Sequence, residues 1–200
     1  MKSKFYSFKI ILSLLTSVFF LLYVPASIFA GGLPVEKGAL GDIGWYVEER
    51  QGKMFYFTHG TTVWGHEFGF YKNLSRYNED ILWLTFSSSD ENVKDFIGKD
   101  AVVALDIDGE IIKVTLNMLT AGTIGFTHVM YFSNWLAGEQ LIDALEKGQS
   151  VKVQILEPKE IEVLLDIKED IFDLNGFENA RKKALEICED YSAFSKQQSE

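Results

Sequence analysis

The feature that most constrains the fold is a hairpin pattern in the middle of the chain. Two apolar runs, 101–106 and 111–116, flank Asp108-Gly109, and this pair tolerates the positive φ angles of a tight turn between antiparallel strands. One face of the two strands is apolar at alternate positions: Val103, Leu105, Ile107, Ile112, Val114 and Leu116. Lys113 and Thr115 face the other way, so the pattern predicts a sheet with one buried and one solvated face.

Similar short runs recur between turn residues, at spacings typical of an antiparallel sandwich or barrel. They span 43–49, 53–59, 64–71, 81–86, 101–106, 111–116, 123–132, 151–156 and 161–167. Helical periodicity interrupts them twice, at 134–147, where Asn134 caps and Gly148 stops the helix, and at 176–190. The sequence therefore predicts a mainly β fold, an antiparallel β-sandwich of about eight or nine strands with two short α-helices, one of them C-terminal.

The first thirty residues have the order of a secretory signal peptide. Three lysines precede an uncharged run, 10–24, which ends at Pro25 and a segment of small residues. Ala30 fits the position before a signal-peptidase cut, with Ala26 as a second candidate. An uncleaved anchor is the alternative, because a spanning helix needs only about 20 apolar residues. Both interpretations place the remaining chain outside the cytosol, and cleavage predicts a periplasmic or secreted protein without a membrane span.

Beyond this segment we expect a flexible lead-in over 31–42, a single β-sandwich domain over 43–191 and a polar tail over 192–200. The chain is 47% hydrophobic and 14% aromatic, which is enough to form a core. No internal repeat or low-complexity block divides it.

The charge balance argues against nucleic acid as a partner. The formal net charge is -10, and the few cations are scattered among acids rather than gathered into the basic face that a polyanion binder needs. A single cysteine, Cys188, excludes a disulfide framework or a cysteine zinc site within one chain. It lies near the edge of the apolar stripe of the last helix, where it is either buried or free to form an intermolecular disulfide. A monomer and a homodimer both stay open.

Three histidines are candidates for metal binding. His59, His66 and His128 each lie in an expected strand with apolar neighbours two residues away, and three converging imidazoles would hold zinc or copper. The alternative is that each is a core or strand-end histidine bonded to the backbone, and the absence of local His-rich metal motifs favours it. No cofactor is predicted.

The sequence carries no catalytic signature. The Gly-x-Ser-x-Gly elbow of many hydrolases is absent, whereas paired carboxylates stay open because their spacing is spatial. The four tryptophans, Trp45, Trp64, Trp83 and Trp135, among many Phe and Tyr indicate a binding surface instead, since aromatic residues are enriched in recognition hot spots. Trp45, Trp64 and Trp135 are its candidate residues, and the alternative is that they belong to the core.

Several segments of the second half follow a shared order: an Asp-Gly hairpin within 97–109, a Leu-containing helix ending in Lys-Gly within 141–149, and Leu174-Asn175-Gly176-Phe177 before an Ala-containing helix. This order over 97–188, with Trp45 at the start of an early strand, is similar to the invasion-associated locus B family of exported bacterial proteins. The resemblance implies a small periplasmic or secreted β-sandwich of a Gram-negative bacterium, linked to host-cell colonisation, with no established catalytic residues.

Together these features lead us to expect an exported, non-enzymatic β-sandwich that binds a protein or envelope component through an aromatic-bearing face. A histidine-based metal-binding protein and an exported hydrolase are the alternatives.

Overall fold

One antiparallel sheet of ten strands dominates the computed structural model, which describes residues 33–34, 44–63, 65–74 and 76–197. The strand order is β1-β2-β3-β4-β5-β8-β7-β6-β9-β10. The strands are β1 Leu33–Pro34, β2 Trp45–Arg50, β3 Lys53–His59, β4 Glu67–Asn73, β5 Arg76–Ser88, β6 Asp100–Ile107, β7 Glu110–Ile124, β8 Thr127–Leu136, β9 Ser150–Glu157 and β10 Glu169–Asp173. The predicted signal peptide and all of the lead-in except β1 lie outside the described residues. The mainly β, antiparallel prediction is confirmed, with ten strands rather than eight or nine.

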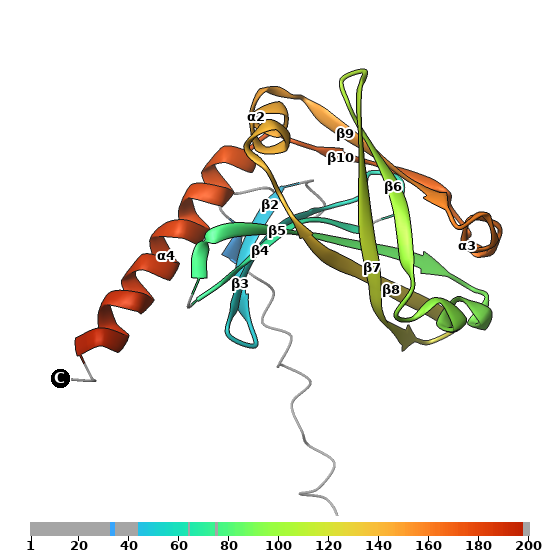
Figure 1. The fold of residues 1–200 in the computed structure, drawn as a ribbon, viewed down its shortest axis with the longest axis horizontal. Helices are drawn as coiled ribbons and strands as arrows, with labels where there is room; N and C mark the ends of the chain where they lie inside the picture. Colours follow the sequence, from blue (N-terminus) through green and yellow to red (C-terminus); the bar gives the residue numbers. More distant parts are fainter. Residues whose placement is uncertain (1–32, 35–43, 64, 75, 198–200) are drawn as a thin grey trace, which may run out of the picture. The chain divides into compact units, whose positions relative to one another are not determined.

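The sheet folds over on itself, so that its last strands lie across from its first ones (Figure 1). The backbone N–H of Thr61, after β3, donates to the carbonyl oxygen of Ile171 in β10 at 2.8 Å. Phe68 of β4 and Phe172 of β10 are both fully buried, with ring centroids 5.5 Å apart. The two halves therefore share one core, which gives the sandwich-like arrangement that the sequence predicts.

The central hairpin forms as the sequence predicts. β6 and β7 pair from Asp100↔Asn117 to Ile107↔Glu110, and the turn has φ angles of 48° at Asp108 and 98° at Gly109. The Asp108 carboxylate also accepts the backbone N–H groups of Gln149 and Ser150, at 2.8 and 3.3 Å. One residue thus shapes the turn and joins it to the start of β9.

The helices of the described chain are the 3-10 helix η1 (Glu91–Phe96) and the α-helices α2 (Glu139–Lys147), α3 (Lys159–Leu164) and α4 (Phe177–Gln197). The prediction of two short helices is therefore incomplete. Gly148 ends α2 as expected, but α2 begins at Glu139 rather than after Asn134, because β8 continues to Leu136.

Two predicted strands are wrong. The range 123–132 is not one strand, because β7 ends at Ile124, β8 begins at Thr127 and a turn lies between them. Residues 161–164 belong to α3, because Ile161 and Leu165 are buried at helical spacing while Val163 is 74% exposed. The strand forms instead from the acidic run at 169–173, where Asp170 and Phe172 alternate inward and pair with β9.

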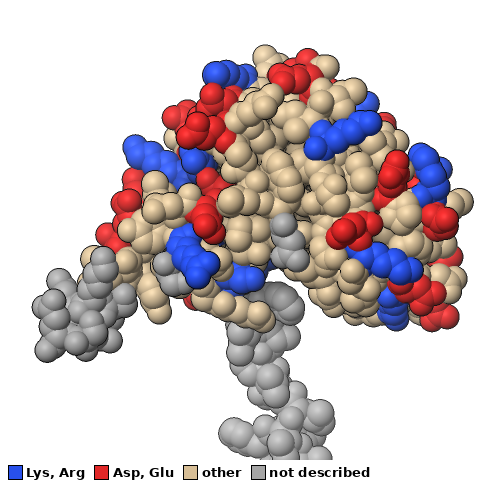
Figure 2. All heavy atoms as spheres, viewed as in Figure 1, with Lys and Arg blue, Asp and Glu red and all other residues tan. Residues whose placement is uncertain are grey.

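Helix α4 packs against β2 and β3 (Figure 1). Its buried stripe consists of Phe177, Ala180, Ala184 and Cys188. Small side chains in this stripe allow the helix to approach the sheet closely. The helix also continues past the predicted end at 190 to Gln197. On the face shown in Figure 2, Lys and Arg side chains lie among Asp and Glu side chains.

Candidate functional site

The strongest candidate site is an aromatic cluster, partly buried and partly exposed, on the side of the sheet that faces away from the main core. In β3, Met54 and Tyr56 join the main core, whereas Phe55 and Phe57 point to the opposite side. There they form a separate buried cluster with Tyr71, and the partly exposed rings of Tyr46, Trp83 and Tyr131 adjoin it. We define the outer aromatic face by six residues: Tyr46, Phe55, Phe57, Tyr71, Trp83 and Tyr131. Strands β2, β3, β4, β5 and β8 each contribute to it, so the sheet itself fixes the spacing of the rings.

The rings of this face are in direct contact. Trp83 lies edge-on to Phe55 with centroids 5.1 Å apart, and its ring is 5.4 Å from that of Tyr131. Tyr46 stacks on Phe57 at 5.6 Å. These offset and edge-to-face arrangements are the geometries that aromatic pairs favour.

A glycine in β4 makes room for them. Gly69 pairs with Phe57 on one side and Trp83 on the other. A Cβ atom at this position would lie 2.5 Å from the Cα atom of Phe57 and 2.2 Å from the carbonyl oxygen of Tyr56. The sheet therefore has no space for a side chain at Gly69.

Two cations lie over the aromatic rings. The guanidinium carbon of Arg50 is 4.6 Å from the centroid of Phe57, and Lys53 Nζ is 4.4 Å from the centroid of Tyr71. Such cation–π contacts stabilise the cation on an apolar surface. The Arg50 side chain is partly exposed.

One carboxylate organises the polar side of the face. Glu67 accepts hydrogen bonds from Trp83 Nε1 at 3.0 Å and from Arg50 at 3.4 Å, while Arg50 also pairs with Glu48. Partial burial and the nearby Glu67 charge raise the pKa of Tyr131. Its phenol is protonated at neutral pH, as an ordinary tyrosine is, and can donate a hydrogen bond.

The tryptophans chosen from the sequence occupy different places. The prediction that Trp45 belongs to a binding surface is wrong. Trp45 is buried in the main core against Phe177, and its Nε1 donates to the carbonyl oxygen of Asp173 at 3.0 Å. Trp135 packs partly against the same core. Trp64 lies outside the described residues. Trp83, which was named with the other tryptophans but is not among the three candidate residues, lies on the outer aromatic face.

A second arrangement of chemical interest joins three distant residues. His66 Nδ1 is 2.9 Å from Asp170 Oδ2, and His66 Nε2 is 2.9 Å from Ser87 Oγ. His66 and Asp170 are fully buried, whereas Ser87 is partly exposed. This is the acid, base and hydroxyl order of a serine hydrolase triad.

Hydrogen bonds around this triad keep the Asp170 carboxylate ionised and orient the His66 ring. Burial alone raises the pKa of Asp170, but hydrogen bonds from His66 and from the N–H groups of Thr62, Ile171 and Val63 lower it below its ordinary value. The ionised Asp170 then accepts the Nδ1 proton, which leaves Nε2 as an acceptor. The backbone N–H of Ser87 also donates to Nε2, at 3.0 Å, so it competes with the Ser87 hydroxyl for the same lone pair.

The other two histidines have different surroundings. His59 ends β3, and its ring contacts Tyr46 and Phe57 at the edge of the outer aromatic face. His128 is buried in β8, where its Nδ1 is 3.0 Å from Thr123 Oγ1. Within the described ranges, no group of three or more His, Cys, Asp or Glu side chains is placed to hold a metal ion. The geometry therefore gives no support to a common three-histidine site.

A buried ionic network lies beneath α4. Asp80 accepts hydrogen bonds from Tyr56 at 2.6 Å, from Arg181 at 3.0 Å and from Lys72. Burial alone raises the pKa of Asp80, but the bonds from Lys72 and Tyr56 and the nearby cationic charges lower it below its ordinary value. Burial and the Asp80 charge raise the pKa of Tyr56 well above its ordinary value. The network therefore joins α4 to β3, β4 and β5 through charged and neutral partners.

The single cysteine is more buried than the sequence indicated. Cys188 is fully buried between α4 and the sheet, and burial raises the pKa of its thiol. A disulfide with a second chain therefore requires α4 to move away from the sheet first.

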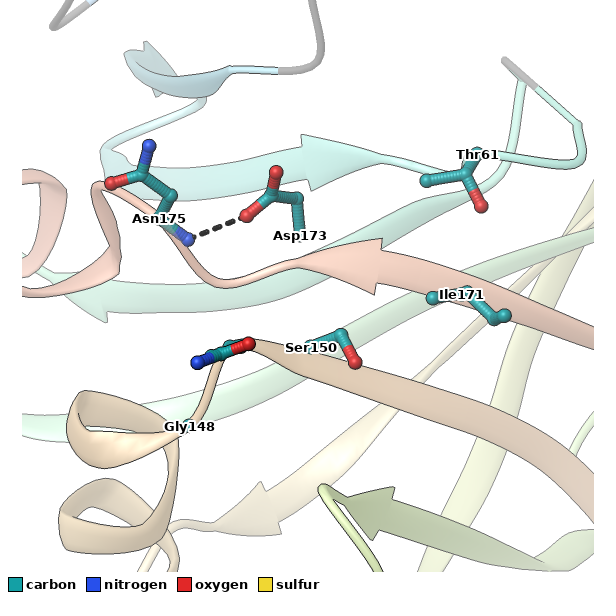
Figure 3. A pocket seen from close by; sticks show the side chains of 7 residues that line it. Thr61, Gly148, Ser150, Ile171, Asp173 and Asn175 are labelled. Atoms are coloured by element: carbon teal, nitrogen blue, oxygen red, sulfur yellow. Dashed lines mark hydrogen bonds between the residues drawn. The ribbon is translucent and has the colours of Figure 1, made fainter.

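An open hollow of about 620 Å³ lies where the loop after β3 meets the start of β9 and the end of β10 (Figure 3). Its lining residues are Thr61, Gly148, Gln149, Ser150, Ile171, Asp173 and Asn175. The Asp173 carboxylate accepts the backbone N–H of Asn175 at 2.7 Å. Hydroxyl and amide groups surround this acid, and the described lining contains no base to pair with it.

Comparisons with known proteins give no family or relative for this chain. No protein-family model matches the chain, and neither the curated proteins nor the solved structures contain a match. Among the helices of the described residues, none is both long and apolar enough to cross a membrane.

The residues that sequence reasoning missed share one signal. Phe55 and Phe57 alternate with Met54 and Tyr56, so β3 is apolar on both faces, although an antiparallel sheet usually has one solvated face. That pattern is visible in the sequence. The triad carries no comparable signal, because 104 residues separate His66 from Asp170.

Proposed function

We propose that this chain is an exported, non-enzymatic β-sandwich protein that binds a protein partner through the outer aromatic face. The observation that carries the proposal is the gathering of Tyr46, Trp83, Tyr131 and Arg50 on one sheet face. Trp, Tyr and Arg are the residues most enriched in the hot spots of protein interfaces. Rings held by five strands also lose little conformational freedom when a partner binds.

Export is part of the proposal. It is supported by the first thirty residues, in which lysines are followed by an uncharged apolar run and then by small residues, as in a signal peptide. The resemblance of 97–188 to the invasion-associated locus B family supports the same compartment. It would make the partner a protein of the cell envelope or of a colonised host cell.

Site-specific crosslinking tests the proposal. Benzoylphenylalanine replaces Tyr46 or Tyr131 on the face, or Tyr191 as a control on the exposed side of α4. After irradiation in envelope or host-cell extract, both face positions should give a product of the same mass, and position 191 should not. Excess unlabelled wild-type chain should compete for this product.

A variant separates recognition from folding. Trp83→Ala in excess should fail to compete, provided that its far-ultraviolet circular dichroism and unfolding midpoint match a folded protein. Arg50→Gln, which removes only the charge above the rings, should compete at least about fivefold less well. The proposal would be refuted if wild type, Trp83→Ala and Arg50→Gln competed equally well. It would also be refuted if position 191 gave as much crosslinked product as positions 46 and 131.

The Ser87, His66 and Asp170 arrangement supports a second candidate function, that of an exported hydrolase. In this reaction His66 Nε2 takes the hydroxyl proton as Ser87 Oγ attacks an acyl carbon. The leaving group departs with that proton, and water then hydrolyses the acyl-enzyme. The backbone N–H of Ser87 competes with the hydroxyl for the same Nε2 lone pair.

A fluorophosphonate probe, which phosphonylates activated serine hydroxyls, tests this candidate. Labelling of the wild-type chain that is lost in Ser87→Ala and in His66→Gln, and retained in the neighbouring Ser89→Ala, is the expected result. A wild-type chain that stays unlabelled would rule the candidate out, and the three residues would then serve only to close the sheet.

A further inference from the structure

A long stretch of the chain carries no charge. From Val114 to Gly138 the sequence contains no Asp, Glu, Lys or Arg, although 24% of the whole chain is charged. This stretch comprises most of β7 and all of β8, so it is one continuous hairpin. Its inward side chains up to Met118 and from Met130 to Phe132 belong to the main core, whereas residues 123–126 at its two-residue turn are exposed.

The end of this hairpin is apolar and projects into solvent. We define the hairpin tip as Ile124, Gly125 and Phe126. Phe126 is 97% exposed and Ile124 is 70% exposed, whereas folded proteins usually bury large apolar side chains. Gly125 adopts a φ of 63°, which allows the tight turn between the two strands.

The backbone at the tip is already hydrogen-bonded. Ile124 pairs with Thr127, and Thr123 pairs with His128. An element that enters a lipid interface must satisfy its backbone N–H and C=O groups internally, because the hydrocarbon supplies no partners. A paired hairpin with apolar side chains at its end meets that requirement at shallow depth.

We propose that the hairpin tip inserts into the interfacial region of a lipid bilayer. A protein partner would have to provide a pocket for this convex end, whereas a bilayer accepts a projecting Phe and Ile without one. The tip has no charge to recognise an anionic headgroup, and the chain carries a net charge of -10. The lipid surface is therefore a zwitterionic one, and burial of the two side chains supplies the binding energy.

This site lies apart from the outer aromatic face and does not depend on its function. A chain held at a bilayer by its hairpin tip keeps that face available for a partner protein. The two proposals therefore succeed or fail separately.

A tryptophan placed at the tip tests the proposal in the full chain. Phe126→Trp is mixed with vesicles of phosphatidylcholine, with and without lipids brominated on the acyl chains, and the wild-type emission is subtracted. The expected result is a blue shift and loss of at least about half of the added fluorescence to bromine quenching. Ile111→Trp is the matched control, because Ile111 is 62% exposed at the opposite end of β7. It should show neither change, whatever residues 1–30 contribute to vesicle binding.

Further variants separate insertion from other causes. Ile124→Trp should be quenched like Phe126→Trp, and the double variant Ile124→Trp/Phe126→Asp should lose the quenching, because a carboxylate at the tip opposes insertion. Addition of anionic phosphatidylglycerol should not increase the quenching. Three results would overturn the proposal: no quenching at position 126, equal quenching at position 111, or a blue shift that appears without lipid as protein concentration rises. The last result would assign the tip to a second copy of the chain.

Discussion

At the scale of single residues, buried charges of this chain are held by several partners at once. Asp80 is bonded to Tyr56, Lys72 and Arg181, and Asp170 is bonded to His66 and to three backbone N–H groups. Burying a charge is costly unless it is paired and hydrogen-bonded. Loss of one partner therefore leaves another charge or donor buried without compensation.

Asp80→Asn should destabilise the protein by about 3 kcal/mol, because Lys72 then stays buried without its counter-charge. Urea unfolding measures the change as a lower midpoint at unchanged slope. Asp143→Asn is the control, since Asp143 forms an exposed pair with Lys147, and its effect should stay within about 0.5 kcal/mol. Similar losses in both variants would contradict this account of the network.

Because the pKa of Asp170 is lowered in the folded chain, we expect the protein to lose stability at acid pH. The pKa of this carboxyl is lower in the folded chain than its ordinary value of 3.8. Its contribution to stability is therefore fully present above that ordinary pKa and is lost as pH falls through the lower, folded value. Asp170→Asn should be less stable than wild type at pH 7, by about 1–3 kcal/mol. Its stability should also fall less steeply below about pH 4. Parallel curves of unfolding free energy against pH would refute this prediction.

At the scale of elements, local turn chemistry was predictable and strand neighbours were not. The Asp108-Gly109 turn and the stop at Gly148 depend on residues close in sequence, and both form as expected. Residues 161–167 alternate like a strand, but Ile161 and Leu165 also match a helical spacing of four. Only the pairing of 169–173 with β9 decides between the two, and that pairing depends on tertiary structure.

The close packing of β4 beneath the outer aromatic face leaves no space for a side chain at Gly69. Gly69→Ala should destabilise the chain by about 2 kcal/mol or more, because the new Cβ meets the backbone of β3 and paired strands cannot separate locally. Gly65→Ala is the matched control, since no atom lies within 4 Å of a Cβ added there. Chemical denaturation of both variants measures the difference. If Gly69→Ala is as stable as Gly65→Ala, the β3 backbone does not lie as close to Gly69 as the structure places it.

At the scale of the whole molecule, α4 completes the core on one side of the folded sheet. Its buried stripe and the bond from Arg181 to Asp80 attach it to strands far away in sequence. Neither attachment was predictable in detail, because periodicity shows which helix face is buried but not what covers it. Sequence reasoning placed Cys188 at the edge of the stripe, whereas the structure buries it completely.

Cys188 should therefore report on the integrity of the whole fold. The thiol should react with 5,5′-dithiobis(2-nitrobenzoic acid) at least about 100-fold more slowly in buffer than in urea, because burial blocks access and raises its pKa. The folded protein should run as a monomer on a denaturing gel without reductant. Rapid labelling in buffer, or a disulfide-linked dimer, would show that α4 leaves the sheet readily.

The contact between Asp170 and the loop after β3 also has a consequence for the order of folding. The acceptor for His66 and for the N–H groups of Thr62 and Val63 lies 104 to 108 residues later in the chain. During synthesis the N-terminal part of a chain is available first. The donors of this loop are therefore bonded to water until residue 170 has left the ribosome. Arrival of Asp170 then marks completion of the sheet, so a chain that ends before residue 170 should remain open at this corner.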